Sequence, residues 1–137
     1  ADCTSQLKGD VRTMAPGDAI TVGAVKIEAV PAYNPHKPYH PQANRWLGFI
    51  LTVEGKRIYF AGDTDLIPEM KGIRVDIAIL PVGGTYTMTA AEAAQAAALI
   101  HPEVAIPIHC GDIVGTMEDA KEFHRLTPVP VEVKTPS

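Results

Sequence analysis

The hydrophobic pattern changes once along the chain, and this change restricts the fold more than any other feature. Apolar residues alternate with polar ones through Ile20–Ala29 and again through Leu47–Phe60, as in strands paired in hairpins. Further along, the short apolar run Val75–Leu80 is typical of a buried strand, and Val104–Ile108 forms another. Hairpins followed by a strand–helix–strand–helix order predict an α/β fold with a mixed sheet.

A helix is expected between the last two of these strands. Thr89 and Glu92 fit a capping box, in which each side chain accepts from the other residue's free backbone N–H. The alanine-rich stretch Ala90–Ile100 has high helix propensity, and Pro102 ends it. Three more elements are expected: a short helix at Pro68–Met70, a helix at Met117–Leu126 and a final short strand at Val129–Val133.

Composition narrows the class of protein. The 137 residues have the size of one domain, residues 1–137, and 46% hydrophobic with 20% charged residues indicates a globular chain. A net charge of -4 argues against a nucleic-acid surface, which is usually basic. Cys3 and Cys110 do not make a disulfide framework, and no signal-peptide or membrane-spanning pattern is seen, so we expect a cytoplasmic protein.

Two polar motifs stand at strand ends, where sites of layered α/β folds gather. Gly62–Asp65 follows one strand, and His109–Gly111 follows another. Asp63 and His109 are residue types that bind divalent metals, through a carboxylate oxygen and a neutral ring nitrogen. An Asp at such a turn more often caps a helix, and a His there is more often hydrogen-bonded to nearby backbone.

The long loop after the first hairpin carries further candidates. His36 and His40 are not a helical pair, since prolines interrupt the loop, and either is a candidate metal ligand. Lys37 and Arg45 could hold a phosphate or carboxylate of a substrate. Tyr86 could donate a hydrogen bond to a substrate. For each residue the alternative is an exposed or merely packed side chain.

Three segments together resemble the metallo-β-lactamase superfamily, and most of all its ascorbate-6-phosphate lactonase-like branch. They are Phe60–Asp65, Leu80–Met88 and Ile106–Gly111. The resemblance implies that Asp63 bridges two metal ions, Zn or Mn, and that His109 is a terminal ligand. It also implies a metal-activated water that hydrolyses a lactone, an amide or a phosphoester.

The chain departs from that family in one respect. The family's His-x-His-x-Asp-His motif, which supplies most metal ligands upstream, has no counterpart among the five histidines here. Near Tyr33 and Asn34, where a further family ligand often stands, the chain has no histidine, and His36 or His40 could substitute. The resemblance therefore indicates the C-terminal half of a helix–sheet–sheet–helix sandwich, a mixed sheet with helices on one face.

A half sandwich has consequences for function. One interpretation is a metal-dependent hydrolase whose site is incomplete in this chain. Whether the chain alone has enzyme activity stays open. A second is a non-catalytic half-domain, and a third is a nuclease of the same superfamily. An uncovered sheet face predicts association with the missing N-terminal half or with a second copy of the chain.

Overall fold

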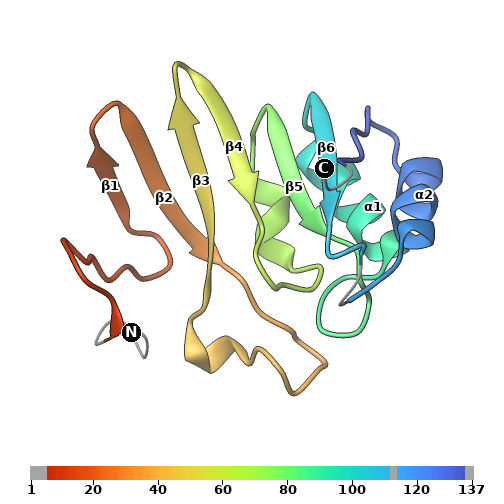
Figure 1. The fold of residues 1–137 in the computed structure, drawn as a ribbon, viewed down its shortest axis with the longest axis horizontal. Coiled ribbons are helices and arrows are strands. Elements are labelled where there is room, and N and C mark those ends of the chain that lie inside the picture. The colour runs from red at the N-terminus through yellow and green to blue at the C-terminus, as the bar shows by residue number, and fades with distance from the viewer. Residues whose placement is uncertain (1–5, 112–113, 135–137) are drawn as a thin grey trace.

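Six strands form one mixed sheet in the computed structural model, which describes residues 6–111 and 114–134 (Figure 1). The strands are β1 (Ala19–Val22), β2 (Val25–Pro31), β3 (Leu47–Val53), β4 (Lys56–Phe60), β5 (Ile77–Pro81) and β6 (Val104–Ile108). The helices are η2 (Gln42–Asn44), η3 (Pro68–Gly72), α1 (Ala90–Ile100) and α2 (Met117–Leu126). The predicted α/β class with a mixed sheet and helices on one face is confirmed.

The order of strands in the sheet follows the order in the chain. Strands β1 to β4 pair antiparallel through hairpins, and β4, β5 and β6 pair parallel. Consequently β2, β4, β5 and β6 all end at the same edge of the sheet, where β3 begins. The loop between β2 and β3 lies at this edge too (Figure 1).

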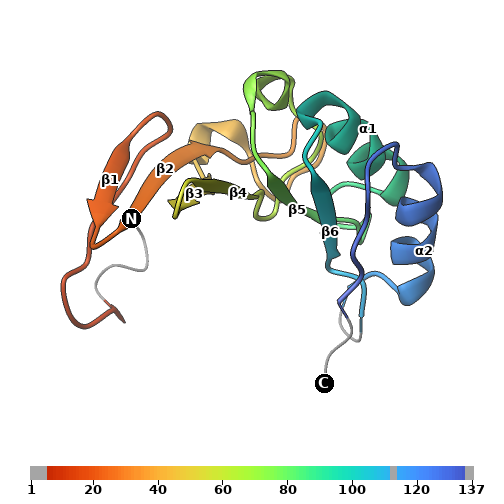
Figure 2. The same cartoon turned by 90° about the horizontal axis from the view of Figure 1, so that it is seen from above.

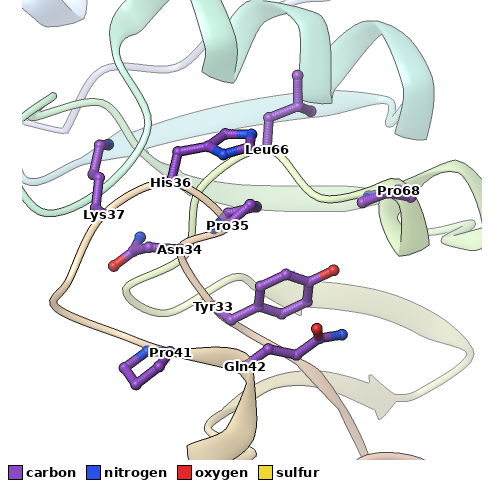
Figure 3. Close-up of a pocket in the computed structure, with 9 residues that line it drawn as sticks. All are labelled: Tyr33, Asn34, Pro35, His36, Lys37, Pro41, Gln42, Leu66 and Pro68. Atoms are coloured by element: carbon purple, nitrogen blue, oxygen red, sulfur yellow. The ribbon is translucent and has the colours of Figure 1, made fainter.

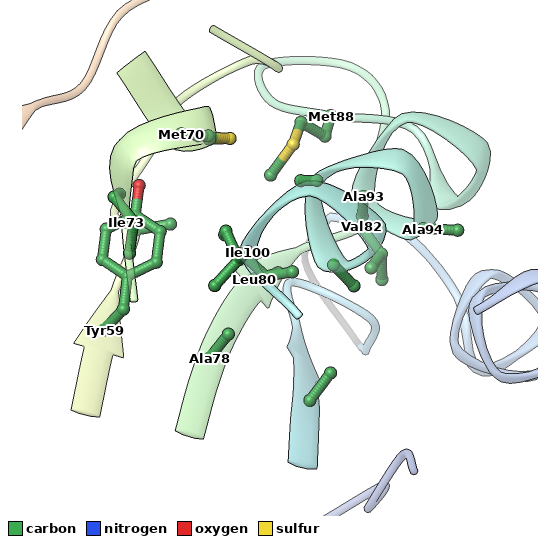
Figure 4. Packing of buried hydrophobic residues seen from close by; sticks show 14 of the residues in the cluster. Tyr59, Met70, Ile73, Ala78, Leu80, Val82, Met88, Ala93, Ala94 and Ile100 are labelled. Carbon is green, nitrogen blue, oxygen red and sulfur yellow. The ribbon is translucent and has the colours of Figure 1, made fainter. Parts of the chain in front are cut away.

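The helices cover one face of the sheet (Figure 2). Ala78 and Leu80 of β5 point toward them and are fully buried, as are Ala93 and Ala97 of α1. Small alanine side chains let the helix lie close to the strands, and the space around them is filled by larger residues (Figure 4). This cluster is the core of the described chain.

Both α-helices begin with a capping box. The Thr89 hydroxyl accepts from the N–H of Glu92 at 3.2 Å, and the Glu92 carboxylate accepts from the N–H of Thr89 at 2.8 Å, as predicted. Thr116 and Asp119 make the same pair of bonds at the start of α2. Each box satisfies backbone donors that a helix leaves free at its first turn.

The opposite face of the sheet is concave, and no helix of the described residues lies above it (Figure 2). The side chains that β3 to β6 place on this face are mostly apolar. Cross-strand neighbours such as Phe49 and Phe60, or Ile79 and Ile106, lie side by side on it. Nine of its apolar members in β3 to β6 keep solvent exposure: Phe49, Leu51, Ile58, Phe60, Ile77, Ile79, Val104, Ile106 and Ile108. We call these nine residues the open face.

The final strand predicted at Val129–Val133 is only an isolated bridge between Ala105 and Val131. Two hydrogen bonds hold it, from the N–H of Ala105 to Pro130 and from the N–H of Glu132 to Ala105. Pro128 and Pro130 have no N–H to donate, so a longer ladder does not form. The predicted Pro68–Met70 helix is 3-10 in form and reaches Gly72.

The structure bears on two features of the sequence, its lack of a membrane-spanning pattern and its two cysteines. None of the helices in the described part of the chain is both long and apolar enough to cross a membrane. Cys3 lies outside the described residues, and Cys110 is a free cysteine.

Candidate metal centre

Three segments meet at the edge of the sheet where the parallel strands end. Asp63 follows β4, His109 follows β6, and His40 comes from the loop between β2 and β3. Strand β5 lies between β4 and β6, and the chain after it continues as Gly83 and Gly84, which have no side chains to fill the space. Asp63 and His109 therefore face each other across the end of β5.

The Asp63 carboxylate lies between the two imidazoles. Nε2 of His109 is 3.3 Å from Oδ1, and Nε2 of His40 is 3.9 Å from Oδ2. The Asp63 side chain is 50% exposed and those of His109 and His40 are 34% and 14% exposed, so the group is reachable from solvent. Each ring thus faces a different oxygen of one carboxylate.

These separations can be compared with those in a metal site. Metal–nitrogen distances of about 2.0–2.1 Å and metal–oxygen distances of about 2.0–2.2 Å place two ligands of one tetrahedral ion about 3.3 Å apart. The separation of His109 from Asp63 equals this spacing, and that of His40 from Asp63 is wider. A carboxylate that meets a different partner at each oxygen suits the bridging position between two ions.

The donor set is nevertheless sparse. Within residues 6–111 and 114–134, no group of three or more His, Cys, Asp or Glu side chains is placed to hold one ion. Asp63 with His109, and Asp63 with His40, give two ligands at each position, whereas zinc sites usually take three or four from the protein. The residues present therefore fit part of a metal centre.

The His40 ring is fixed from two sides. Its Nδ1 lies 2.6 Å from Oδ1 of Asn34, a residue only 3% exposed. The Trp46 indole packs edge-to-face against it, with ring centroids 4.6 Å apart. Holding one ring nitrogen in a hydrogen bond leaves the other directed toward Asp63.

His109 has a left-handed backbone with φ of 56°, which is uncommon for a residue with a side chain. Its carbonyl is approached by Gly83 and Gly115, where a Cβ would clash with it. The two glycines thus allow three backbones to meet closely. Strained backbone of this kind is found at functional sites.

The loop that carries His40 is tied to the segment that carries Asp63. The buried Thr64 hydroxyl accepts from the N–H of Tyr33 at 3.1 Å and donates to the Tyr33 carbonyl at 3.1 Å. The Lys37 ammonium donates to Asp65 at 2.7 Å. The two residues that make these bonds directly follow Asp63 in sequence, so they hold its segment against the His40 loop.

The carboxylate opens into a hollow of about 460 Å³. Its walls include His40, Trp46, Phe60 and Asp63. A second, apolar hollow of about 710 Å³ lies over the open face, includes His109, and shares Phe60 as a wall. The candidate centre therefore lies where a polar edge meets the uncovered face of the sheet.

Of the predicted site residues, the structure brings together Asp63, His109 and His40. His36 is exposed and lines a different hollow of about 550 Å³, on the side of the loop where Tyr33 and Leu66 lie (Figure 3). It does not join the group around Asp63.

The residues expected to bind substrate have other partners or positions. Lys37 bonds to Asp65 and to the carbonyl of Thr87, which ties it to the fold. Arg45 is exposed with a left-handed backbone after η2. Tyr86 is 43% exposed, packs edge-to-face on Tyr39, and gives its carbonyl to Asn34.

Sequence reasoning missed three supporting residues: Asn34, Thr64 and Trp46. Thr64 belongs to the Gly-Asp-Thr motif, and that position could have indicated a structural role. Asn34 and Trp46 lie in a loop without periodicity, and no local pattern indicates the burial of Asn34 or the packing of Trp46 on His40.

Known proteins resemble this chain over most of its length. Residues 2–109 match the family described as β-lactamase superfamily domain. A UPF0173 metal-dependent hydrolase of Methanopyrus kandleri is 36% identical over 124 residues, covering 85% of this chain and 54% of that relative. One of Thermococcus kodakarensis is 32% identical over 139 residues, covering 97% and 62%.

A solved structure agrees with the sequence relatives. A crystal structure from Parabacteroides distasonis, named for a metal-dependent hydrolase, superposes with a TM-score of 0.80 at 40% identity, over 90% of this chain and 57% of that one. The chain spans about half the length of the curated relatives it matches, with 41%, 54% and 55% for three of them. The family match covers well over half of the chain, which therefore belongs to the metallo-β-lactamase superfamily.

Proposed function

We propose that this chain forms one side of a two-metal hydrolytic centre. Asp63 is shared between the two ions, His109 binds one ion and His40 the other. The observation that carries the proposal is that two histidine Nε2 atoms face different oxygens of one carboxylate. Zinc or manganese is the metal that we expect.

The residues of the chain have distinct tasks in hydrolysis. Bound divalent ions supply a nucleophile at neutral pH, because they lower the pKa of water to about 7, and they polarise a substrate oxygen. Asp63 brings negative charge to the open side of the hollow. Asn34 and Trp46 hold His40 in orientation, and the glycine contacts hold His109.

The hollow suits a small substrate with an apolar portion. Trp46 and Phe60 are 41% and 42% exposed and stand beside Asp63, so an apolar group can pack on them while the reacting bond meets the carboxylate edge. Lactones, amides and phosphoesters are the classes proposed. The ascorbate-6-phosphate lactonase-like branch stays a prediction.

The test compares three histidines of the same chain. In a protein that contains both halves of the sandwich, we expect His109→Ala and His40→Ala each to lose one metal equivalent and to lower hydrolysis by more than about 100-fold, the upper range for residues that only support a ligand. His36→Ala, with an exposed ring in a separate hollow, is the matched control and should keep metal content and rate. Metal analysis and hydrolysis of lactone and phosphodiester substrates are the measurements. Full metal content in both the His109 and His40 variants would sink the proposal.

The remaining ligands require another surface. We propose that this chain forms one half of a sandwich, and that an N-terminal half packs on the open face and completes the metal shells. The proposal is supported by the position of His109 in the hollow over that face, and by longer relatives, of which this chain covers 54% and 57%. A parallel sheet is usually covered on both faces, since each bare face exposes apolar side chains to water.

Self-association is the expected behaviour of the chain when this face stays bare. We expect light scattering of the 137-residue chain to give a mass that rises with concentration, because a large apolar patch associates in water. Replacing Ile79 and Ile106, neighbours on the open face, with lysine should lower that mass to a monomer's while circular dichroism stays unchanged. Leu99→Lys, at a 41% exposed position on the helical side, is the matched control. A wild-type monomer at all concentrations would contradict an uncovered interface.

A cytoplasmic location stays a prediction from cysteine content.

Burial raises the pKa of the Cys110 thiol, with a smaller effect of Asp119 in the same direction. Its sulfur lies 3.9 Å from the carbonyl of Pro107. These features favour a packed thiol over a third ligand beside His109.

A further inference from the structure

Asn34 lies behind the ring of His40 and is one of few buried polar residues in the described chain. Its side-chain amide makes two hydrogen bonds in opposite directions. Nδ2 donates to the carbonyl of Tyr86 at 3.1 Å, and Oδ1 lies 2.6 Å from Nδ1 of His40. A buried amide with both ends engaged has one orientation only.

The direction of this hydrogen-bond chain follows from the Tyr86 carbonyl. A backbone carbonyl accepts and never donates, so the amide end that faces it is the NH₂ group. The end that faces His40 is then the oxygen, which also only accepts. Nδ1 of His40 therefore carries a proton and donates it to Asn34.

With a proton on Nδ1, the neutral imidazole has its lone pair on Nε2. That atom is the one that faces Oδ2 of Asp63, at 3.9 Å. The separation is too long for a direct hydrogen bond. The lone pair is thus presented to the space between ring and carboxylate, where the proposed function places an ion.

We propose that Asn34 is a positioning residue that selects the metal-binding tautomer of His40. The inference rests on the proposed function for the identity of His40 as a ligand. A backbone bond from the N–H of Asn34 to the carbonyl of His40, at 2.8 Å, closes the loop between them. Backbone and side chain of Asn34 together fix both the place of His40 and its protonation pattern.

The hydrogen-bond chain that ends at His40 begins at the backbone carbonyl of Tyr86. It belongs to the segment between β5 and α1, and Tyr86 packs on Tyr39, the residue before His40. The orientation of a loop ligand is thereby set by a segment about fifty positions away in sequence. An amide satisfies both partners at once, because it donates to the Tyr86 carbonyl and accepts from His40, whereas a carboxylate can only accept.

The experiment reads the tautomer directly. Nitrogen-15 NMR of histidine-labelled full chain without metal, at a pH where the ring is neutral, distinguishes a protonated Nδ1 from a protonated Nε2. We expect a protonated Nδ1 for wild-type His40. Asn34→Leu should release the ring to the Nε2-protonated form that predominates in a free histidine side chain, and should lower zinc affinity roughly 10–100-fold, as loss of a ligand's supporting partner does.

Two comparisons separate this role from a general effect on folding. Asn34→Asp keeps an acceptor for Nδ1 but cannot donate to Tyr86, so it should keep the tautomer. Gln42→Leu removes an exposed amide of the same loop and should change neither tautomer nor affinity. The exposed His36 ring gives an internal reference in every spectrum.

The outcomes distinguish the two proposals. A wild-type His40 protonated on Nε2, or an unchanged tautomer in Asn34→Leu, overturns the role of Asn34. A changed tautomer with unchanged zinc affinity overturns it as well, while the metal centre stands. If the tautomer is as expected but no variant takes up zinc, the metal centre fails, and the positioning role fails with it.

Discussion

Asp63→Ala is expected to remove both metal ions and to abolish hydrolysis, an effect larger than that of either histidine variant. The reason is geometric, since Asp63 meets His109 through one oxygen and His40 through the other. Removing a histidine leaves the second pair intact, whereas removing the carboxylate breaks both pairs. We expect a rate reduced by well over about 100-fold, beyond the range for supporting residues.

The fold should tolerate this change. The Asp63 side chain is half exposed, so the free energy of unfolding of the metal-free protein should move by less than about 0.5 kcal/mol, as for other surface substitutions. In a protein with both halves of the sandwich, metal analysis should give no bound ions for Asp63→Ala, one for each histidine variant, and two without any substitution. Asp10→Ala, an exposed carboxylate paired with Arg12, is the control. One ion retained by Asp63→Ala would disprove the shared carboxylate.

Local patterns predict that Asp63 and His109 each stand at the end of a strand, and the order of β4, β5 and β6 in the sheet brings these ends together. Parallel strands end at one edge, and two strands that flank a third lie about 10 Å apart. Side chains at their ends then lean toward each other over the intervening strand. The glycines after β5 leave this space free, and Gly83-Gly84 is visible in the sequence.

The choice of His40 over His36 could not be made in this way. Both lie in one proline-rich loop with no regular period, so their directions depend on contacts made after folding. The buried Thr64 and Asn34 decide the outcome by bonding to Tyr33 and His40. The bond between Thr64 and Tyr33 joins positions 31 residues apart, and the bond between Asn34 and His40 lies within an irregular loop, so no local pattern indicates either of them.

Local patterns succeeded where local energies dominate. The capping box at Thr89 uses residues three positions apart, and alternation in the hairpins needs only neighbouring positions. The expected strand at Val129–Val133 failed because Pro128 and Pro130 remove donors that its apolar side chains could not replace. A pattern of side chains predicts burial better than it predicts backbone pairing.

The second large effect is a loss of stability expected at Gly115, which lies against the left-handed backbone of His109. Gly115 has a φ of 69°, and a methyl group there would meet the carbonyl of His109 and lie 2.8 Å from the Cα of Gly83. Neither neighbour is a flexible side chain, so the backbone itself must move. We expect Gly115→Ala to lower the free energy of unfolding by roughly 2–5 kcal/mol, from backbone strain and overpacking together.

Two other glycines separate these contributions. Gly55 also has a positive φ, of 79°, but nothing lies within 4 Å of its Cβ position, so Gly55→Ala measures the strain of the left-handed backbone alone. Gly111, beside the site, has open space at its Cβ position, and Gly111→Ala should cost little. Denaturant unfolding of the three variants gives the energies, and zinc titration gives the consequence for His109. The clash at Gly115 pushes on the carbonyl of His109. Gly115→Ala should therefore lower zinc affinity under conditions in which the variant is still folded, whereas Gly55→Ala should leave it unchanged. Equal unfolding energies for Gly115→Ala and Gly55→Ala would contradict a close backbone contact at His109.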